Sequence, residues 1–315
     1  MWLIRCEEEA GEYGKSPAER SVEEHIKNSV VIVDKHSGPT SHQITAWVKE
    51  IFGVKKAGHA GTLDPKVTGV LPVALENATK AMPVLMGLDK EYVGVMHLHR
   101  EMDEEILRRV IVEKFVGKIV QIPPVKSAVA RVPRERKIYY FDILEIEGKD
   151  VLFKIGCEAG TYVRKVIHDL GVQLGVGAHM KELRRTKVGN FSEDEAHSLV
   201  KIRDAYEFWK EGEESLIRKV LIPIEYAIAH VKKVFVKDSA VYPITCGAPV
   251  YVKGITRVQE GIEKGEIVAV FSLKDELIAL GIAKMNSEEM VNRKKGIAVR
   301  TDRVFMEKGT YPKIV

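Results

Sequence analysis

The sequence predicts an α+β fold in two domains: a mixed, largely antiparallel sheet with helices, followed by a small β-barrel. Three observations support this prediction. The chain has 315 residues, which favours more than one domain. Up to about residue 230, hairpins and helices follow one another without the strict alternation of a parallel sheet. From residue 231 on, short strands alternate with glycine turns, as in a small barrel.

We therefore expect four segments along the chain. Residues 1–28 are acidic and predict an irregular extension over the surface. Residues 29–230 form the larger domain, 231–306 the barrel, and 307–315 a C-terminal tail. The domain boundary is expected within residues 223–230.

Apolar patterning predicts the elements of the larger domain in order. Residues 29–34 form a buried strand, and the hydroxyls of Thr40 and Ser41 begin a helix whose apolar residues recur at helical spacing up to Phe52. A second buried strand covers 70–75. The remaining expected elements are strand 92–99, helix 103–115, a hairpin of 137–147 and 151–157, and helix 161–174. In the barrel, strands are expected at 234–236, 249–252, 267–272, 277–285 and 297–301.

Charge and cysteine content limit the class of protein. The net charge of +4 permits a nucleic-acid partner without requiring one, so local charge must decide. Six Lys or Arg against one acid, Glu135, lie between residues 118 and 140. The three cysteines show no pairing pattern, which argues against a disulfide framework and a cysteine zinc site. The acidic start does not fit a signal peptide, and no apolar run reaches membrane-spanning length, so we expect a protein without membrane association in a reducing compartment, the cytoplasm.

Residues 58–75 form the most informative segment. Glycines at 58, 61 and 69 punctuate a loop that carries one carboxylate, Asp64, directly before a buried strand. Pro65 biases Asp64 away from helical geometry, so the carboxylate sits at a fixed bend. A carboxylate on a stiff loop is a candidate nucleophile. The alternative is an ordinary Asp-Pro turn beside a hairpin.

Two adjoining motifs in this segment resemble one enzyme family. Gly-His-Ala-Gly-Thr-Leu-Asp-Pro at 58–65, followed by Thr-Gly-Val-Leu-Pro-Val-Ala-Leu at 68–75, closely resembles the signature of the TruB-type pseudouridine synthases. These enzymes isomerise uridine in RNA by breaking the base–sugar C–N bond and forming a C–C bond. The resemblance implies that Asp64 is catalytic. It also implies that neither a metal nor a redox cofactor takes part.

The resemblance assigns five further residues. Tyr92 matches the tyrosine that stacks on the flipped uracil, and Arg164 is positioned to keep Asp64 ionised in a dry pocket through a bidentate contact. Leu183 matches a residue that packs on the base, and His59 one linked to base flipping. Lys35 matches a motif that supports the catalytic loop, although His36 stands where the family usually has proline. Without the resemblance, Tyr92 would be a half-buried strand aromatic and Arg164 part of a surface ion pair. Leu183 would be a core leucine and His59 a solvated loop histidine.

A basic segment is expected to contact RNA. Residues 122–140 match a mobile loop that closes over RNA at the active site in the family. Basic side chains of such a lid contact phosphates rather than bases. The residues concerned are Lys126, Arg131, Arg134, Arg136 and Lys137. The alternative is a solvated hairpin tip without a role.

The C-terminal pattern resembles a PUA domain, an RNA-binding barrel, with Lys253 where proline is more common. Together with Lys90–His99 and residues 123–129 and 175–180, it resembles the archaeal and eukaryotic group that includes dyskerin. We interpret the chain as an archaeal member. The resemblance implies an H/ACA guide RNA, rRNA and tRNA substrates, and small accessory proteins of the ribonucleoprotein. Two alternatives stay open: a stand-alone synthase acting on the tRNA T-loop, and a non-catalytic RNA-binding scaffold. His97 and His99 share a strand face, but no third ligand is evident, so we predict no metal site.

Overall fold

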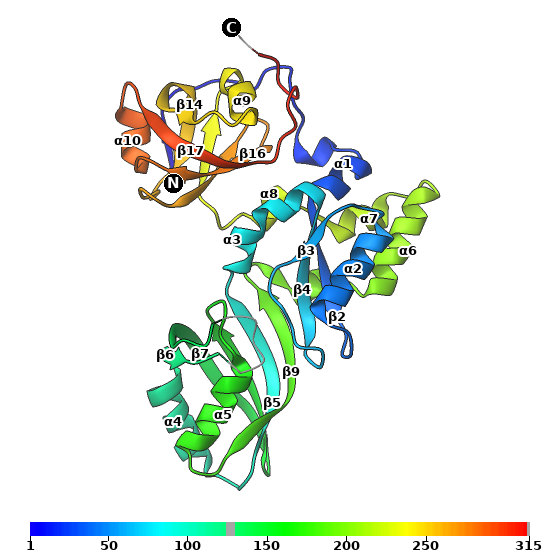
Figure 1. Ribbon diagram of the computed structural model, residues 1–315, viewed down its shortest axis with the longest axis vertical. Helices are drawn as coiled ribbons and strands as arrows, with labels where there is room; N and C mark the ends of the chain where they lie inside the picture. The colour runs from blue at the N-terminus through cyan, green and yellow to red at the C-terminus, as the bar shows by residue number, and fades with distance from the viewer. Residues whose placement is uncertain (124–129, 314–315) are drawn as a thin grey trace.

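Two β-sheets organise the chain (Figure 1). The computed structural model describes residues 1–123 and 130–313. The larger sheet and its helices extend away from a smaller module, near which both chain termini lie. In this described part of the chain, no helix is long and apolar enough to span a membrane.

The larger sheet is mixed and largely antiparallel, as predicted. Among the described residues it has ten strands, and β4 (Thr68–Leu75) and β9 (Ala178–Val188) form its parallel pair. The order is β11 (Leu221–Pro223), β2 (Ser29–Lys35), β4, β9, β5 (Lys90–Leu98), β8 (Asp150–Cys157), β7 (Arg134–Glu147) and β6 (Gly117–Gln121), with β3 (Ala57–His59) on β4 and β10 (Phe191–Ser192) on β9. The predicted hairpin is β7–β8, although β7 begins at Arg134 because it pairs with β6 from that residue onward.

The central strand β9 escaped prediction. Its sequence, Ala-His-Met-Lys-Glu-Leu-Arg-Arg-Thr-Lys-Val, has no apolar run and little period-two alternation. It forms because β4 and β5 supply hydrogen-bonding partners on both edges. Long-range pairing therefore overrides a weak local preference.

The predicted helices are present. α2 (Ser41–Ile51) begins after Thr40, whose hydroxyl accepts from the Gln43 amide at 3.1 Å while the Gln43 side chain accepts from the Thr40 amide at 2.9 Å. α4 (Glu104–Phe115) begins after Asp103, and α5 (Val163–Gln173) packs against β9. The other helices are α1 (Val22–Lys27), α3 (Met82–Met86), α6 (Leu199–Lys210), α7 (Ser215–Val220) and α8 (Ile224–Ala227), the last of which occupies the expected domain boundary.

The smaller module is a curled sheet of seven strands among the described residues. Its order is β1 (Trp2–Ile4), β14 (Ile255–Gln259), β12 (Lys233–Val236), β15 (Ile267–Phe271), β16 (Leu277–Ala283), β17 (Ile297–Val304) and β13 (Val250–Tyr251). The helices α9 (Asp238–Thr245) and α10 (Ser287–Asn292) lie beside it (Figure 1). Strand β14 was not predicted, because Thr, Arg and Gln interrupt its apolar pattern.

The expectation of an irregular N-terminal extension is wrong in two places. Trp2 pairs with Gln259 and Ile4 with Arg257, so β1 completes the sheet of the smaller module. A three-residue strand has no signature of its own and depends on that distant partner. Further on, Ser21 and Glu24 form a capping box that begins α1.

One continuous apolar core joins the two modules. Val30 and Ile32 of β2 belong to the same buried cluster as Phe235 and Phe271 of the smaller sheet. Glu225 of α8 adds a polar junction: its Oε1 accepts from Arg20 Nη2 at 2.7 Å and from the Leu277 amide at 3.1 Å. Apolar burial and a shared carboxylate therefore hold the smaller module against the larger domain.

Candidate active site

Asp64 stands at the corner of a tight turn. The Val67 amide donates to the Asp64 carbonyl at 3.0 Å, which closes a four-residue turn with Pro65 in its second position. Proline suits this position because its ring fixes φ near the required value. Leu63 and Val67 are buried, whereas the Asp64 side chain is 52 % exposed. The Asp-Pro turn is thus present, and it presents the carboxylate to solvent between two buried anchors.

Lys35 holds this turn from the inside. Its fully buried Nζ donates to the carbonyls of Pro65 at 2.9 Å, Val67 at 2.8 Å and His36 at 3.0 Å. Burial lowers the pKa of Lys35, and the nearby Asp64 carboxylate partly offsets that effect. All three donors of the ammonium are therefore used on backbone carbonyls, two of them in the Asp64 turn.

Ser41 supports the turn from the helix side, which sequence reasoning missed. Its buried hydroxyl donates to the Leu63 carbonyl at 3.1 Å and accepts from the Leu63 amide at 2.8 Å. Thr40 alone acts as the N-cap of α2. The two adjacent hydroxyls in the sequence thus do different work, and only their positions relative to the loop distinguish them.

Arg164 forms an ion pair with Asp64. Its Nη2 lies 2.7 Å from Asp64 Oδ2, and the two side chains are 59 % and 52 % exposed. The expectation of a dry pocket around Asp64 is therefore wrong for the chain alone, because water solvates both groups. The bidentate contact stays a prediction. The pair joins the turn to the first residues of α5, which come from a distant part of the sequence.

Tyr92, Leu183 and Arg185 lie on one face of the sheet. The β5–β9 register pairs Tyr92 with Arg185 and Gly94 with Leu183, and alternate residues of a strand share a face. A β-carbon on Gly94 would lie 2.8 Å from Leu183 Cδ1, so glycine makes the room that Leu183 occupies. Burial raises the pKa of the Tyr92 phenol, and the positive charge of Arg185 opposes that rise.

Gly69 is required where β4 meets β9. Its φ is +102°, and a β-carbon there would lie 2.2 Å from the Arg185 carbonyl oxygen. Gly61, on the other side of the turn, has a φ of +103°. These two of the three glycines singled out in the sequence therefore bring the turn against the central strand.

His59 precedes the turn and ends β3. Its ring packs edge-on against His42 with centroids 4.9 Å apart. Burial lowers its pKa, with smaller contributions from His42 and Arg185, and this favours the neutral ring. Its buried Nδ1 has no hydrogen-bond partner in the described part of the chain.

The basic segment is only partly a loop. Arg134, Arg136 and Lys137 lie in β7, where Arg134 pairs with Gln121 and Lys137 with Lys118 of β6. The expectation that they lie in a loop is wrong, because they pair with β6 in a strand; that the segment moves and closes over RNA stays a prediction. Arg131 lies in the connection and donates to the Pro123 carbonyl at 3.4 Å. Lys126 lies outside the described residues.

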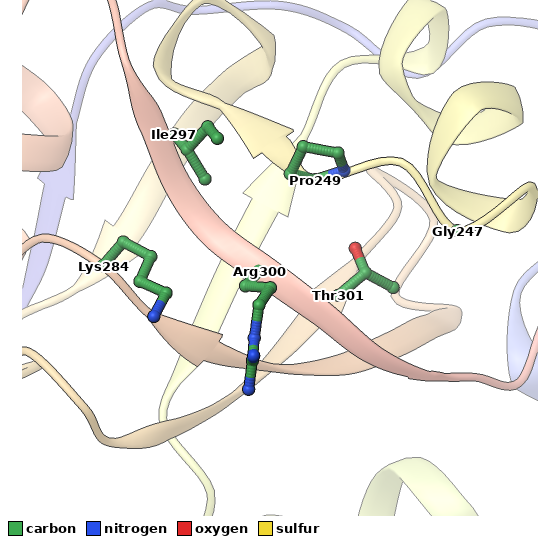
Figure 2. A pocket seen from close by; sticks show the side chains of 6 residues that line it. All are labelled: Gly247, Pro249, Lys284, Ile297, Arg300 and Thr301. Atoms are coloured by element: carbon green, nitrogen blue, oxygen red, sulfur yellow. The ribbon is translucent and has the colours of Figure 1, made fainter.

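A second candidate site lies on the smaller module (Figure 2). It is a cavity of about 350 Å³ with two basic side chains, Lys284 and Arg300, pointing the same way from its wall. The lining residues are Gly247, Pro249, Lys284, Ile297, Arg300 and Thr301. Two cations beside a shallow apolar floor suit a phosphate and an adjoining base.

The histidine pair at the end of β5, His97 and His99, has a third neighbour that the sequence did not reveal. His179 of β9 pairs with His97 across the strands, and its Nδ1 lies 3.1 Å from His99 Nε2. His97 Nδ1 contacts Asp150 Oδ1 at 2.6 Å. Over residues 1–123 and 130–313, no group of three such side chains has the geometry to hold a metal ion.

Models of known families match almost the whole chain. The model described as TruB family pseudouridylate synthase (N terminal domain) matches residues 49–163, and the tRNA pseudouridylate synthase B C-terminal domain matches 164–229. The PUA domain matches 232–305 and the DKCLD domain 2–45. These matches cover both sheets and the N-terminal segment.

Individual relatives and solved structures are also similar over nearly their full length. "Probable tRNA pseudouridine synthase B" of Methanopyrus kandleri is 56% identical over 96% of this chain and 89% of its own. A chain of the "Crystal Structure of a Cbf5-Nop10-Gar1 Complex" is 50% identical with a TM-score of 0.94, covering 100% of this chain and 96% of that one. A chain of the "Structure of H/ACA RNP bound to a substrate RNA containing 2'-deoxyuridine" is 49% identical with a TM-score of 0.93, covering 99% and 96%.

Proposed function

The chain belongs to the TruB family of pseudouridine synthases, and we propose that it isomerises uridine to pseudouridine in RNA at sites chosen by an H/ACA guide RNA. The observation that carries this proposal is the Asp64 turn, held by Lys35 and paired with Arg164 at 2.7 Å. The similarity to a chain bound to substrate RNA within an H/ACA particle supports the guide and the substrate.

The reaction has four steps. The target base leaves its stack, the N1–C1′ bond breaks, the base turns, and a C5–C1′ bond forms as C5 loses a proton and N1 gains one. Asp64 acts as nucleophile or stabilises charge at the sugar. Tyr92 stacks on the base and Leu183 packs beside it, while His59 assists flipping. Because substrate and product are isomers, the balance requires no oxidant or reductant.

Arg164 and Lys35 play supporting roles in this scheme. Once RNA covers the exposed ion pair, Arg164 balances the negative charge of Asp64 away from water. Lys35 keeps the backbone around Asp64 in place before substrate arrives. The basic residues Arg131, Arg134, Arg136 and Lys137, together with Lys126, contact substrate phosphates.

The two modules have different roles in this proposal. We assign catalysis to residues 29–230 and RNA anchoring to residues 231–306, where the cavity with Lys284 and Arg300 offers cationic contacts. Small accessory proteins complete the particle, in line with the complexes of similar chains that contain Nop10 and Gar1. The relatives are archaeal, and we place the protein in the cytoplasm.

A second activity on tRNA has specific support. The similar proteins of Methanopyrus kandleri and Nanoarchaeum equitans are both named "Probable tRNA pseudouridine synthase B". Guide-independent modification of the tRNA T-loop would fit that name. A non-catalytic scaffold is disfavoured, because such a role gives no reason for the Lys35–Asp64–Arg164 arrangement.

One assay tests the proposal. Purified chain with its accessory proteins is incubated with rRNA and tRNA transcripts, with guide RNA added or withheld, and pseudouridine is counted. We expect rRNA modification only with guide. Asp64→Asn should abolish it while guide binding persists, because the amide is a poor nucleophile without charge. The matched control is Asp204→Asn, on an exposed face of α6. Retention of a tenth of the single-turnover rate by Asp64→Asn would refute the role of Asp64.

A further inference from the structure

Arg185 is buried beneath the active site and joins three of its parts. It lies in β9, is 1 % exposed, and stands opposite Tyr92 in the β5 register and Gly69 in the β4 register. Its Nε donates to the Val70 carbonyl at 2.8 Å and its Nη2 to the Gly61 carbonyl at 3.1 Å. These two carbonyls lie on either side of the Asp64 turn, so one guanidinium spans the base of the loop.

The charge of Arg185 has no carboxylate partner in the described part of the chain. Buried cations are normally paired, because removal from water is costly. A second buried cation, Lys90, lies close by, since a β-carbon on Gly61 would lie 3.5 Å from Arg185 Nη1 and 3.6 Å from Lys90 Cε. Burial lowers the pKa of Lys90 to about 8, and the charge of Arg185 adds to that effect. Two cations thus lie buried close together beneath the turn.

We propose that Arg185 is a positioning residue that fixes the Asp64 turn relative to Tyr92 and Leu183. The guanidinium binds carbonyls at both ends of the turn. Strand β9, which carries Arg185, also carries Leu183 and pairs with β5 at Tyr92. The groups that stack on the base and the group that acts on the sugar thereby keep one spacing. This inference rests on the proposed function.

Single-turnover kinetics with saturating guide RNA test the inference. Displacement of a reacting group by about 1 Å costs on the order of 100-fold in rate, and we expect a loss of about that size for Arg185→Met. Substrate-RNA affinity should change less than about threefold, because Arg185 does not reach the surface. Arg185→Lys, which keeps one donor to a carbonyl, should recover at least part of the rate.

The neighbouring arginine provides the matched control. Arg184 lies on the opposite face of β9, is 38 % exposed, and pairs with Asp34 at 2.9 Å. Arg184→Met should retain a rate within about threefold of wild type. Gly61→Ala perturbs the same contact between Arg185 and the Asp64 turn, because the φ of +103° at Gly61 strains any other residue. Rates are referred to the folded fraction, measured by binding of guide RNA.

The outcomes separate the two proposals. A folded Arg185→Met variant with a rate near that of wild type overturns the positioning role, as does an equal loss in Arg184→Met. A lower melting temperature with an unchanged rate per folded molecule means that Arg185 is purely structural, and also overturns it. No pseudouridine from wild type with guide would instead refute the proposed function.

Discussion

Lys35 offers the sharpest test of how the Asp64 turn is held. Lys35→Met keeps an unbranched side chain, one atom shorter than that of lysine, but removes three hydrogen bonds from the ammonium to the carbonyls of His36, Pro65 and Val67. The Pro65 carbonyl keeps a second donor, the Gly38 amide at 2.9 Å. The Val67 carbonyl loses a charged donor in a buried place, whereas His36 is exposed, so water can replace the donor to its carbonyl.

The size of the effect follows from the buried Val67 carbonyl. Leaving a buried acceptor without its donor costs about 1–3 kcal/mol. Replacing a fully buried ammonium by an apolar group returns part of this, because burial disfavours the charge and lowers the pKa of Lys35. We therefore expect the free energy of unfolding of the larger domain to fall by about 1–2 kcal/mol.

Denaturant unfolding and single-turnover kinetics measure the two consequences. The matched control is Lys66→Met, because Lys66 is exposed in the same turn and its loss removes the same charge. We expect the rate of Lys35→Met to drop about 100-fold per folded molecule, since the carboxylate loses its fixed position. If Lys35→Met unfolds and reacts like Lys66→Met, the ammonium does not hold the turn and the reasoning is wrong.

Three further outcomes are expected. Arg164→Met should change the free energy of unfolding by less than about 1 kcal/mol, because the Arg164–Asp64 pair is half exposed. It should nevertheless lower the single-turnover rate strongly, and Arg164→Lys should restore part of that rate. Equal rates in wild type and both variants would contradict this. The pKa of Lys90 is depressed to about 8, so the unfolded chain binds more protons than the folded chain between pH 8 and about 10.4. Over this range the free energy of unfolding of wild type should rise by about 3 kcal/mol relative to that of Lys90→Met in denaturant titrations. A constant difference between the two proteins would exclude a buried ammonium. Replacing Arg131, Arg134 and Lys137 with alanine should weaken substrate-RNA binding and flatten its salt dependence, and an unchanged slope would show that these side chains do not contact phosphates.

The sequence predicted what local chemistry determines. The buried strand expected at 29–34, the helix capped by Thr40 and the Asp64-Pro65 turn each carry their signal within a dozen residues, and the structure places them together. The single-residue assignments of Tyr92 and Leu183 rested on resemblance, since a strand aromatic and a core leucine have no signature of their own.

Other features depend on contacts with residues that are distant in the sequence, which local sequence patterns do not predict. Strand β9 reads as a charged segment, and only its neighbours β4 and β5 make it central. The burial of Arg185 follows from that placement. A usable signal did exist: once Leu183 is assigned to a buried strand face, the residue two positions on shares that face. The openness around Asp64 and Arg164 depends on which surfaces the chain leaves uncovered, and no motif encodes this.

The pairing of β1 with β14 also has a consequence for synthesis. Residues 2–4 leave the ribosome before their partners, 257–259, which follow roughly 250 residues later, and this takes about 12–50 s at about 5–20 residues per second. During that interval the larger domain can fold while the N-terminal strand waits without a partner. Residues 2–4 are therefore made early but are among the last to become ordered, and we expect their deletion to impair closure of the C-terminal module rather than folding of the domain that directly follows them.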